Sequence, residues 1–178
     1  MPSESAEVQV RTGIERDLES LTAIYNHYVR ETAITFDTVP LTPKERLPWL
    51  LSHPEDGPHR LMVATDADSR RVLGYATSGP HRPKPAYATS VETSVYLAPD
   101  AVKGGSLGRR GIGTLLYDAL FAALAGQDVH RAYAGIAQPN EASTRLHERF
   151  GFRRVGTFHE VGRKFGRYWD VAWYEKRL

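Results

Sequence analysis

The segment that most restricts the fold lies in the middle of the chain, where a strand pattern, a glycine-rich stretch and a helix pattern follow one another. Residues 90–98 alternate, so that Val91, Thr93, Val95 and Leu97 share one face of a predicted strand. Residues 103–113 are rich in glycine. The next apolar residues recur at helical spacing and form one stripe: Ile112, Leu115, Leu116, Ala119, Leu120 and Leu124. These three segments predict a mixed α/β arrangement.

The remaining patterns predict further strands and helices on both sides of this segment. Strands are predicted at residues 8–12, 60–65, 72–78, 131–137, 152–160 and 168–176, and helices at 15–31, 43–52 and 140–150. The order is β-α-α-β-β-β-α-β-α-β-β, a mixed α/β pattern. Because the chain has no repeats, no low-complexity tract and no long linker, we expect a single domain over residues 8–178 behind a flexible N-terminus of residues 1–7.

Composition excludes several classes of chemistry. The 178 residues include no cysteine, which excludes disulfides, thiolate nucleophiles and Cys-based zinc sites. The histidines show no ligand spacing, so no metal site is expected. The formal net charge is only +2, which argues against a dedicated nucleic-acid-binding protein. No apolar run is long enough to span a membrane and the N-terminus is unlike a signal peptide, so we expect a cytoplasmic protein.

The glycine-rich loop at residues 108–114 combines glycines with the start of a helix. Glycines let a backbone approach a ligand closely, and a helix N-terminus offers free N–H groups to an anion, so the loop suits a pyrophosphate. A Walker loop is excluded because Gly111 is followed by Ile112 rather than lysine. A dinucleotide-binding fingerprint is disfavoured because the loop lies in mid-chain rather than in an early βαβ unit. A flexible turn that merely begins a helix remains an alternative.

The neighbouring Arg109 and Arg110 fit either a solvated basic surface or a site for an anion.

Two motifs resemble the hallmarks of the GNAT superfamily of N-acetyltransferases. One is similar to the superfamily's pyrophosphate loop and reads Arg110-Gly111-Ile112-Gly113-Thr114-Leu115-Leu116. The other is an asparagine, Asn140, before a helical segment that ends in Gly151-Phe152. Both occur in the superfamily's order and at about its separation. The chain departs from the pattern in two ways, since Gly108 stands where the superfamily has Arg or Gln, and residues 100–107 form a longer segment than expected.

Four further segments resemble the phosphinothricin acetyltransferase family within that superfamily. They are Asn26-His27-Tyr28 with Phe36, Gly79-Pro80 with Ala86-Tyr87, Glu92-Thr93-Ser94-Val95-Tyr96-Leu97, and Gly162-Arg163-Lys164-Phe165-Gly166-Arg167-Tyr168-Trp169-Asp170-Val171. The resemblance extends from about Val8 to the C-terminus.

The resemblance implies an α/β (α+β) fold of the GNAT acyl-CoA N-acyltransferase type. This fold is a mixed, mostly antiparallel sheet flanked by helices, with a V-shaped cleft between its fourth and fifth strands. The implied co-substrate is acetyl-CoA, whose acetyl group passes directly to a primary amine. The residues implied to contact acetyl-CoA are Val95, Tyr96, Leu97, Gly108, Arg109, Arg110, Gly111, Ile112, Gly113, Thr114 and Asn140. Asn140 is also a candidate helix N-cap, and the two roles are compatible.

Two side chains carry the implied chemistry. Glu92 corresponds to a general base that removes a proton from the acceptor ammonium. The alternative is a solvated or salt-bridged residue of a strand. His147 stands where many members of the superfamily have a tyrosine, and it is a candidate for protonating the leaving CoA thiolate or assisting deprotonation. The alternative is a partly exposed histidine on a helix.

Arg82, Tyr87 and Lys164 are the candidate substrate-binding residues, because a cationic side chain suits a carboxylate or phosphinate. The resemblance implies an amino-acid-like substrate such as phosphinothricin, methionine sulfoximine or methionine sulfone. Another small amine or a protein N-terminus is the alternative within enzymes. A catalytically silent acyl-CoA-binding regulator is the alternative from another class, although a pure binding protein has no need of the base Glu92.

The resemblance also implies a homodimer. The last predicted strand carries aromatic residues on both faces, with Trp169, Val171 and Trp173 on one face and Asp170, Ala172 and Tyr174 on the other. An exposed edge strand of a monomer rarely tolerates such a pattern, which supports the dimer. The alternative is that helices cover one face while solvent meets the tyrosine side.

Overall fold

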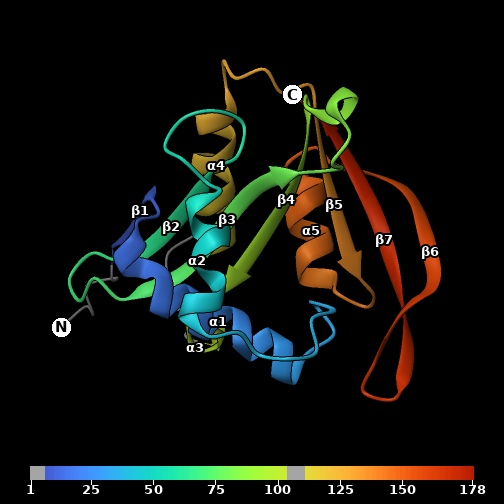
Figure 1. Ribbon diagram of the computed structural model, residues 1–178, viewed down its shortest axis with the longest axis horizontal. Coiled ribbons are helices and arrows are strands. Elements are labelled where there is room, and N and C mark those ends of the chain that lie inside the picture. The colour runs from blue at the N-terminus through green and yellow to red at the C-terminus, as the bar shows by residue number, and fades with distance from the viewer. Residues whose placement is uncertain (1–6, 104–110) are drawn as a thin grey trace.

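The computed structural model describes residues 7–103 and 111–178 (Figure 1). In this part of the chain, seven strands form one sheet in the order β1-β2-β3-β4-β5-β7-β6. The strands are β1 (Val8–Thr12), β2 (Leu61–Asp66), β3 (Val72–Pro80), β4 (Ser90–Leu97), β5 (Arg131–Ala137), β6 (Arg153–Lys164) and β7 (Arg167–Arg177). All neighbouring pairs are antiparallel except β4 and β5, which are parallel. The expected GNAT arrangement, a mixed and mostly antiparallel sheet, is therefore confirmed.

Helices cover both faces of the sheet, as Figure 1 shows. They are η1 (Glu15–Asp17), α1 (Leu18–Glu31), α2 (Pro43–Leu51), η2 (Pro85–Tyr87), α3 (Pro99–Lys103), α4 (Ile112–Leu124) and α5 (Glu141–Arg149). One apolar cluster joins α4 and α5 to one face and contains Leu116, Leu120 and Leu146. The other joins α1 and α2 to the opposite face and contains Leu21 and Leu50. Burial of these two faces from water is the main stabilisation of such a layered fold.

β4 separates the two clusters, as its alternating sequence predicts. Val91, Val95 and Leu97 pack in the cluster with α4, whereas Tyr96 packs in the cluster with α1. The predicted stripe of α4 is also confirmed, with Leu116 and Leu120 completely buried. The sequence pattern missed Tyr117, which is equally buried because α5 covers this side of α4 as well.

The parallel pairing of β4 with β5 is short, and this feature produces the cleft. The paired residues are Ser90 to Glu92 on β4 and Arg131 to Tyr133 on β5. Beyond this end the two strands diverge (Figure 1), while β4 keeps its pairing with β3 as far as Leu97. The backbone groups on the β5 side of β4 after Glu92 therefore have no partner on β5 and are free to meet a ligand.

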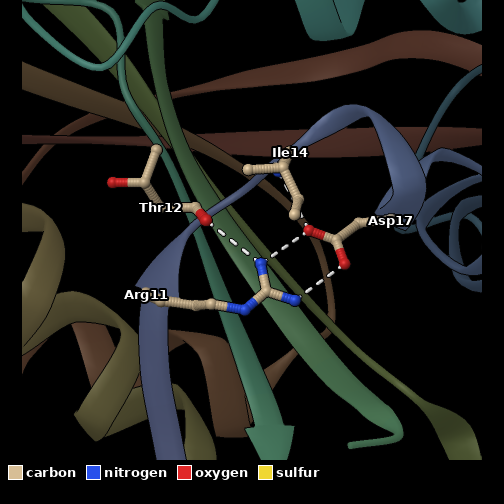
Figure 2. A network of polar contacts seen from close by, with 4 residues as sticks. All are labelled: Arg11, Thr12, Ile14 and Asp17. Atoms are coloured by element: carbon tan, nitrogen blue, oxygen red, sulfur yellow. Dashed lines mark hydrogen bonds and ion pairs between the residues drawn. The ribbon is translucent and has the colours of Figure 1, made fainter.

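A bidentate ion pair connects β1 to the turn that enters α1 (Figure 2). The guanidinium of Arg11 donates to the two carboxylate oxygens of Asp17 at 2.7 and 2.8 Å and to the carbonyl of Thr12 at 3.1 Å. The backbone N–H of Ile14 also donates to Asp17. Burial raises the pKa of Asp17, but the hydrogen bonds from Arg11 and Ile14 outweigh it, so the net pKa lies below the ordinary value.

The last hairpin is longer than the sequence pattern predicts. The predicted strands at residues 152–160 and 168–176 leave residues 161–167 between them, but β6 continues to Lys164 and β7 begins at Arg167, which leaves a two-residue turn. Both turn residues, Phe165 and Gly166, have positive φ, as a tight hairpin turn requires. Helix α3 and the short turns η1 and η2 were not predicted as separate elements, because segments this short carry little periodic signal.

The structure contradicts two interpretations of β7. It is not an edge strand, because it pairs with both β5 and β6, so the edge-strand argument for a dimer does not hold. The alternative, in which solvent meets the tyrosine side, is also wrong. Ala172 is completely buried and Tyr174 is only 4% exposed, so solvent does not meet the tyrosine side. That side belongs to the core beneath α4, whereas Trp173 on the other side contacts the rings of Phe158 and His81. The expected flexible N-terminus lies outside the described residues except for Glu7, whose carbonyl accepts a hydrogen bond from Ala67.

Candidate functional site

The opening between β4 and β5 gathers several predicted site residues. Val95 and Tyr96 line it from β4, and Asn140 and His147 line it from α5. The other lining residues are Ile34, Thr93, Ser94, Ala134, Gly135, Ile136, Ala137 and Ser143. Leu97 lies at the end of β4 with its side chain in the core, and its carbonyl accepts a 2.5 Å hydrogen bond from the hydroxyl of Tyr28. The cleft is therefore built from two strand backbones and the first turns of one helix.

The start of α4 fits an anionic group. Gly111 is the N-cap and makes no side-chain cap, and a Cβ added there would meet nothing within 4 Å. The hydroxyl of Thr114 in the first turn is buried and has no hydrogen-bond partner in the described part of the chain. Open space over a glycine, an orphaned hydroxyl and the free N–H groups of a helix start suit a pyrophosphate.

The other residues of the glycine-rich loop at 108–114 either pack in the core or lie outside the residues that the structure describes. Ile112 is buried in the core. A Cβ on Gly113 would lie 3.2 Å from Leu146, so this glycine lets α4 approach α5 closely. Gly108, Arg109, Arg110 and residues 104–107 of the long segment lie outside the described residues.

Asn140 caps α5, as its sequence context predicts. Its side-chain oxygen accepts a hydrogen bond of 3.1 Å from the backbone N–H of Ser143. Because Asn140 also lines the opening, its amide group is available to a ligand there. The capping role is confirmed, and contact with the cofactor stays a prediction.

His147 is deeply buried on α5, which contradicts the alternative of a partly exposed helix histidine. It is 3% exposed and contacts the rings of Tyr117 and Phe152. Its Nδ1 lies 2.7 Å from the carbonyl oxygen of Ser143, and its Nε2 lies 2.8 Å from the hydroxyl of Tyr117. The Tyr117 hydroxyl in turn lies 3.2 Å from the hydroxyl of Thr93 on β4. A polar chain thus connects α5 with β4 across the core.

The partners of His147 determine which nitrogen holds a proton. A carbonyl oxygen only accepts, so Nδ1 carries the proton and donates to Ser143. Nε2 of the neutral ring then accepts from Tyr117, whereas in the cation it donates to Tyr117, which can donate onward to Thr93. Burial lowers the pKa of His147. The ring is therefore mainly neutral near pH 7, with hydrogen-bond partners in both states.

Glu92 lies at the last paired position of β4, directly before the cleft opens. Its side chain is 38% exposed, and Oε2 lies 3.5 Å from Nδ1 of His81. Burial raises its pKa, and the nearby His81 and Arg82 offset only part of this increase. A carboxylate with a raised pKa beside a cleft is the pattern expected of a general base.

Two of the three predicted substrate-binding residues lie near Glu92. Arg82 is close enough to affect the pKa of Glu92 by its charge. Tyr87, on η2, is 44% exposed and its ring centroid lies 6.0 Å from that of His81. These residues belong to the loop between β3 and β4, which follows the β3 position paired with Glu92, Gly79.

Lys164 lies elsewhere and is buried. Its Nζ donates to the carbonyl of Thr35 at 2.8 Å and lies 3.5 Å from the carbonyl of Tyr28 in the last turn of α1. Burial lowers its pKa. A Cβ on the nearby Gly162 would overlap the ring of Phe36, so this hairpin packs tightly on residues 35–36. The geometry favours a structural anchor for Lys164 over contact with a substrate.

Sequence reasoning missed His81, Tyr117 and Thr93. His81 reaches Glu92 through the register of β3 and β4, which a single sequence does not specify. Tyr117 places a hydroxyl beside the apolar stripe of α4. Because a buried tyrosine hydroxyl needs a hydrogen-bond partner, this residue could have indicated a polar contact in the core. The predicted side-chain roles of Glu92, His147, Arg82 and Tyr87 stay predictions.

A larger hollow of about 850 Å³ lies over β1, η1 and the turn between β2 and β3. It is lined by Arg11, Arg16, Arg70 and Arg71 and contains neither Glu92 nor His147. The narrower cleft at β4 and β5 is the better candidate site, because it combines strand backbone, a helix start and titratable groups.

The mixed sheet, the diverging parallel pair and the open glycine at a helix start define the class of acyl-CoA-dependent N-acyltransferases. The sequence profile of the family described as "Acetyltransferase (GNAT) domain" matches residues 10–173. The chain therefore belongs to the GNAT family, and it is an acetyl-CoA-dependent N-acetyltransferase.

Comparison with individual proteins gives the same family. The chain is 74% identical over 174 residues to phosphinothricin N-acetyltransferase of Streptomyces coelicolor, with 98% of both chains covered. It is 35% identical to the L-methionine sulfoximine/L-methionine sulfone acetyltransferase of Pseudomonas paraeruginosa, covering 91% of this chain and 90% of that protein. A phosphinothricin acetyltransferase of Sinorhizobium meliloti, solved in complex with acetyl-CoA, superimposes with a TM-score of 0.85 at 29% identity, covering 96% of this chain and 88% of that chain.

The described residues lack two further kinds of feature. No helix among them is both long and apolar enough to cross a bilayer. No group of three or more histidine or acidic side chains among them could hold a metal ion.

Proposed function

We propose that the protein transfers the acetyl group of acetyl-CoA to the primary amine of a small amino-acid-like substrate of the phosphinothricin or methionine sulfoximine type. The observation that carries this proposal is the 74% identity to phosphinothricin N-acetyltransferase over 98% of both chains. The 35% identity to the methionine sulfoximine and sulfone acetyltransferase supports the same chemical class. Arg82 and Tyr87 are the proposed contacts to the substrate's acidic group, because a guanidinium and a phenol suit a carboxylate or phosphinate.

Glu92 is the proposed general base. An amine attacks a thioester only in its neutral form, so the substrate ammonium must first lose a proton. The carboxylate of Glu92 takes this proton directly or through one water. The raised pKa of Glu92 makes it a better proton acceptor than an ordinary glutamate.

Acetyl-CoA supplies an activated acetyl group as its thioester. The amine nitrogen forms a bond to the carbonyl carbon, and the bond from that carbon to sulfur breaks. Unpaired backbone N–H groups of β4 beyond Glu92 are the proposed donors to the carbonyl oxygen as negative charge develops on it. His147 is the proposed proton donor to the departing sulfur. Because its pKa is lowered, its cation gives up a proton readily but is scarce near pH 7, so we expect a smaller contribution than that of Glu92.

Replacement of the base tests this assignment. Glu92→Gln should lower kcat by roughly 10²–10⁴-fold, because the amide cannot accept the proton. The affinity for acetyl-CoA, measured by calorimetry, should stay nearly unchanged. His147→Ala should also lower kcat, but by a smaller factor. A wild-type kcat in Glu92→Gln would assign Glu92 a structural role.

A substrate screen with detection of free CoA thiol distinguishes the possible functions. We expect phosphinothricin or methionine sulfoximine to give the highest kcat/KM among amino acids and simple amines. A higher kcat/KM for another amine or for a peptide N-terminus would reject the proposed substrate class but keep the reaction. Acetyl-CoA binding without turnover on any acceptor would favour a silent regulator.

We infer that two copies associate as a homodimer in the cytoplasm. Five apolar side chains of the β6–β7 hairpin are more than half exposed: Val155, Phe158, Val161, Phe165 and Tyr168. Such a concentration on one hairpin supports a protein contact there. Light scattering at micromolar concentration should give twice the chain mass of 19.9 kDa. The mass of one chain would reject the dimer, and enzyme recovered outside the cytoplasmic fraction would reject the location.

A further inference from the structure

His81 lies in the loop after β3 with its ring held between aromatic side chains. The ring stacks on Tyr133 of β5, with centroids 4.5 Å apart and planes at 20°. Tyr87 and Trp173 approach the same ring at 6.0 and 6.1 Å with nearly perpendicular planes. Three chain segments therefore fix the orientation of this ring, and its side chain is only 14% exposed.

The held ring directs a nitrogen at the proposed base. Nδ1 of His81 lies 3.5 Å from Oε2 of Glu92. This nitrogen is buried and makes no hydrogen bond within the described residues. Tyr133, the residue on which His81 stacks, is also the partner of Glu92 across the parallel pair. A buried imidazole nitrogen without another partner among the described residues is thus held beside the carboxylate of Glu92.

Few other groups determine the protonation of Glu92. Arg82 affects the pKa of Glu92 only through its charge. Tyr133 of β5 is paired with Glu92 across the parallel strands. Among the described residues, His81 is the side chain that lies within ion-pair distance of the Glu92 carboxylate.

We propose that His81 is a positioning residue for Glu92. The aromatic clamp keeps Nδ1 against Oε2, which fixes the direction in which the carboxylate faces the amine. The proton that leaves the substrate nitrogen then passes to the Glu92 carboxylate. This inference rests on the proposed role of Glu92 as the base. It adds to that role the residue that orients and tunes the base.

Three replacements of His81 distinguish the role of the aromatic ring from the roles of its two nitrogens. His81→Phe keeps a ring to stack on Tyr133 but removes Nδ1. His81→Asn places an amide group near the position of Nδ1, and His81→Gln places one near the position of Nε2. If Nδ1 orients Glu92, His81→Phe should lower kcat/KM at pH 7 about tenfold, and His81→Asn should recover more of this loss than His81→Gln. Circular dichroism and the melting temperature check that each variant is folded.

The pH profile supplies a readout that a packing role would not change. His81 lowers the pKa of Glu92, so loss of the imidazole should raise that pKa. The acidic limb of kcat/KM in His81→Phe should therefore move to higher pH, by about one unit, with the KM for acetyl-CoA unchanged. An acidic limb at the wild-type pH in folded His81→Phe, or equal recovery by the Asn and Gln variants, would overturn the inference.

A measurement without turnover separates this inference from the proposed function. The ¹³C-carboxyl resonance of Glu92, assigned by its loss in Glu92→Gln, should titrate at higher pH in His81→Phe than in the wild type. An unchanged titration of Glu92 would reject the proposed role of His81 even if Glu92 is the base. Full activity of Glu92→Gln combined with a shifted titration would instead reject Glu92 as the base and still support the influence of His81 on Glu92.

Discussion

Gly111 offers a sharp test of the cofactor site, because the protein itself leaves the space above it open. Its φ of −63° and ψ of 156° are accessible to any residue, and a Cβ there would meet nothing within 4 Å. Gly111→Glu should therefore fold normally. A carboxylate at a helix N-terminus even stabilises the helix by about 0.3–1 kcal/mol, so the melting temperature should not fall.

The same carboxylate should repel an anionic ligand at the start of α4. Two unit charges about 4 Å apart repel by about 1 kcal/mol in water and by about 4 kcal/mol at an effective dielectric constant near 20. The dissociation constant for acetyl-CoA should accordingly rise by between about 5-fold and about 10³-fold. The loss should shrink at high salt, because salt screens exposed charges.

Calorimetry with acetyl-CoA measures this effect against two control variants. Gly111→Gln adds the same volume without the charge, and Gly156→Glu adds the charge at another glycine with open space, on β6. We expect weak binding in Gly111→Glu, intermediate binding in Gly111→Gln and wild-type binding in Gly156→Glu. Wild-type affinity in folded Gly111→Glu would refute the placement of the pyrophosphate at this helix start.

Three further predictions concern the polar groups of the core. Tyr117→Phe removes the hydroxyl that pairs with Nε2 of His147, so the free energy of unfolding in urea should fall by about 1–3 kcal/mol, and kcat should fall as well. Lys164→Met should lower stability by a similar amount without raising the KM for the amine, and a raised KM would restore Lys164 to the substrate site. Asp17→Asn should cost about 1–3 kcal/mol near pH 7. Because the pKa of Asp17 is lowered on folding, its contribution is present above the ordinary pKa near 3.8 and is lost as the pH falls below it, so wild type and Asp17→Asn should converge in acid.

The sequence predicts those features that repeat at a fixed period or follow a local rule. The alternation in residues 90–98 predicted which side chains of β4 enter each apolar cluster, and the cap at Asn140 followed from its residue type and place. Positive φ at Gly151 likewise agrees with the predicted end of α5. Such features depend on neighbours a few residues apart, which a single sequence displays.

Features that depend on register or on distant packing were not predictable in this way. The contact of His81 with Glu92 requires the alignment of Gly79 with Glu92 and the stacking on Tyr133. The burial of Lys164 requires the hairpin to fold back onto residues 35–36, some 130 positions away in the chain. The residues around Lys164 give no indication of this burial, so the sequence alone favours an exposed lysine that can bind substrate.

The geometry of β4 explains why base and cofactor cleft can share one strand. Where β4 pairs with β5, the backbone of Glu92 is held by the sheet and its carboxylate lies 3.5 Å from Nδ1 of His81. Immediately beyond, the pairing ends and the backbone of residues 93–97 is free on one side to bind an extended ligand. Because successive side chains of a strand point to opposite faces, Thr93 meets the hydroxyl of Tyr117, and through it His147, on the face away from Glu92. The proposed proton acceptor and proton donor therefore lie on opposite faces of the sheet, so that the amine can lose its proton on one face while the sulfur gains one on the other.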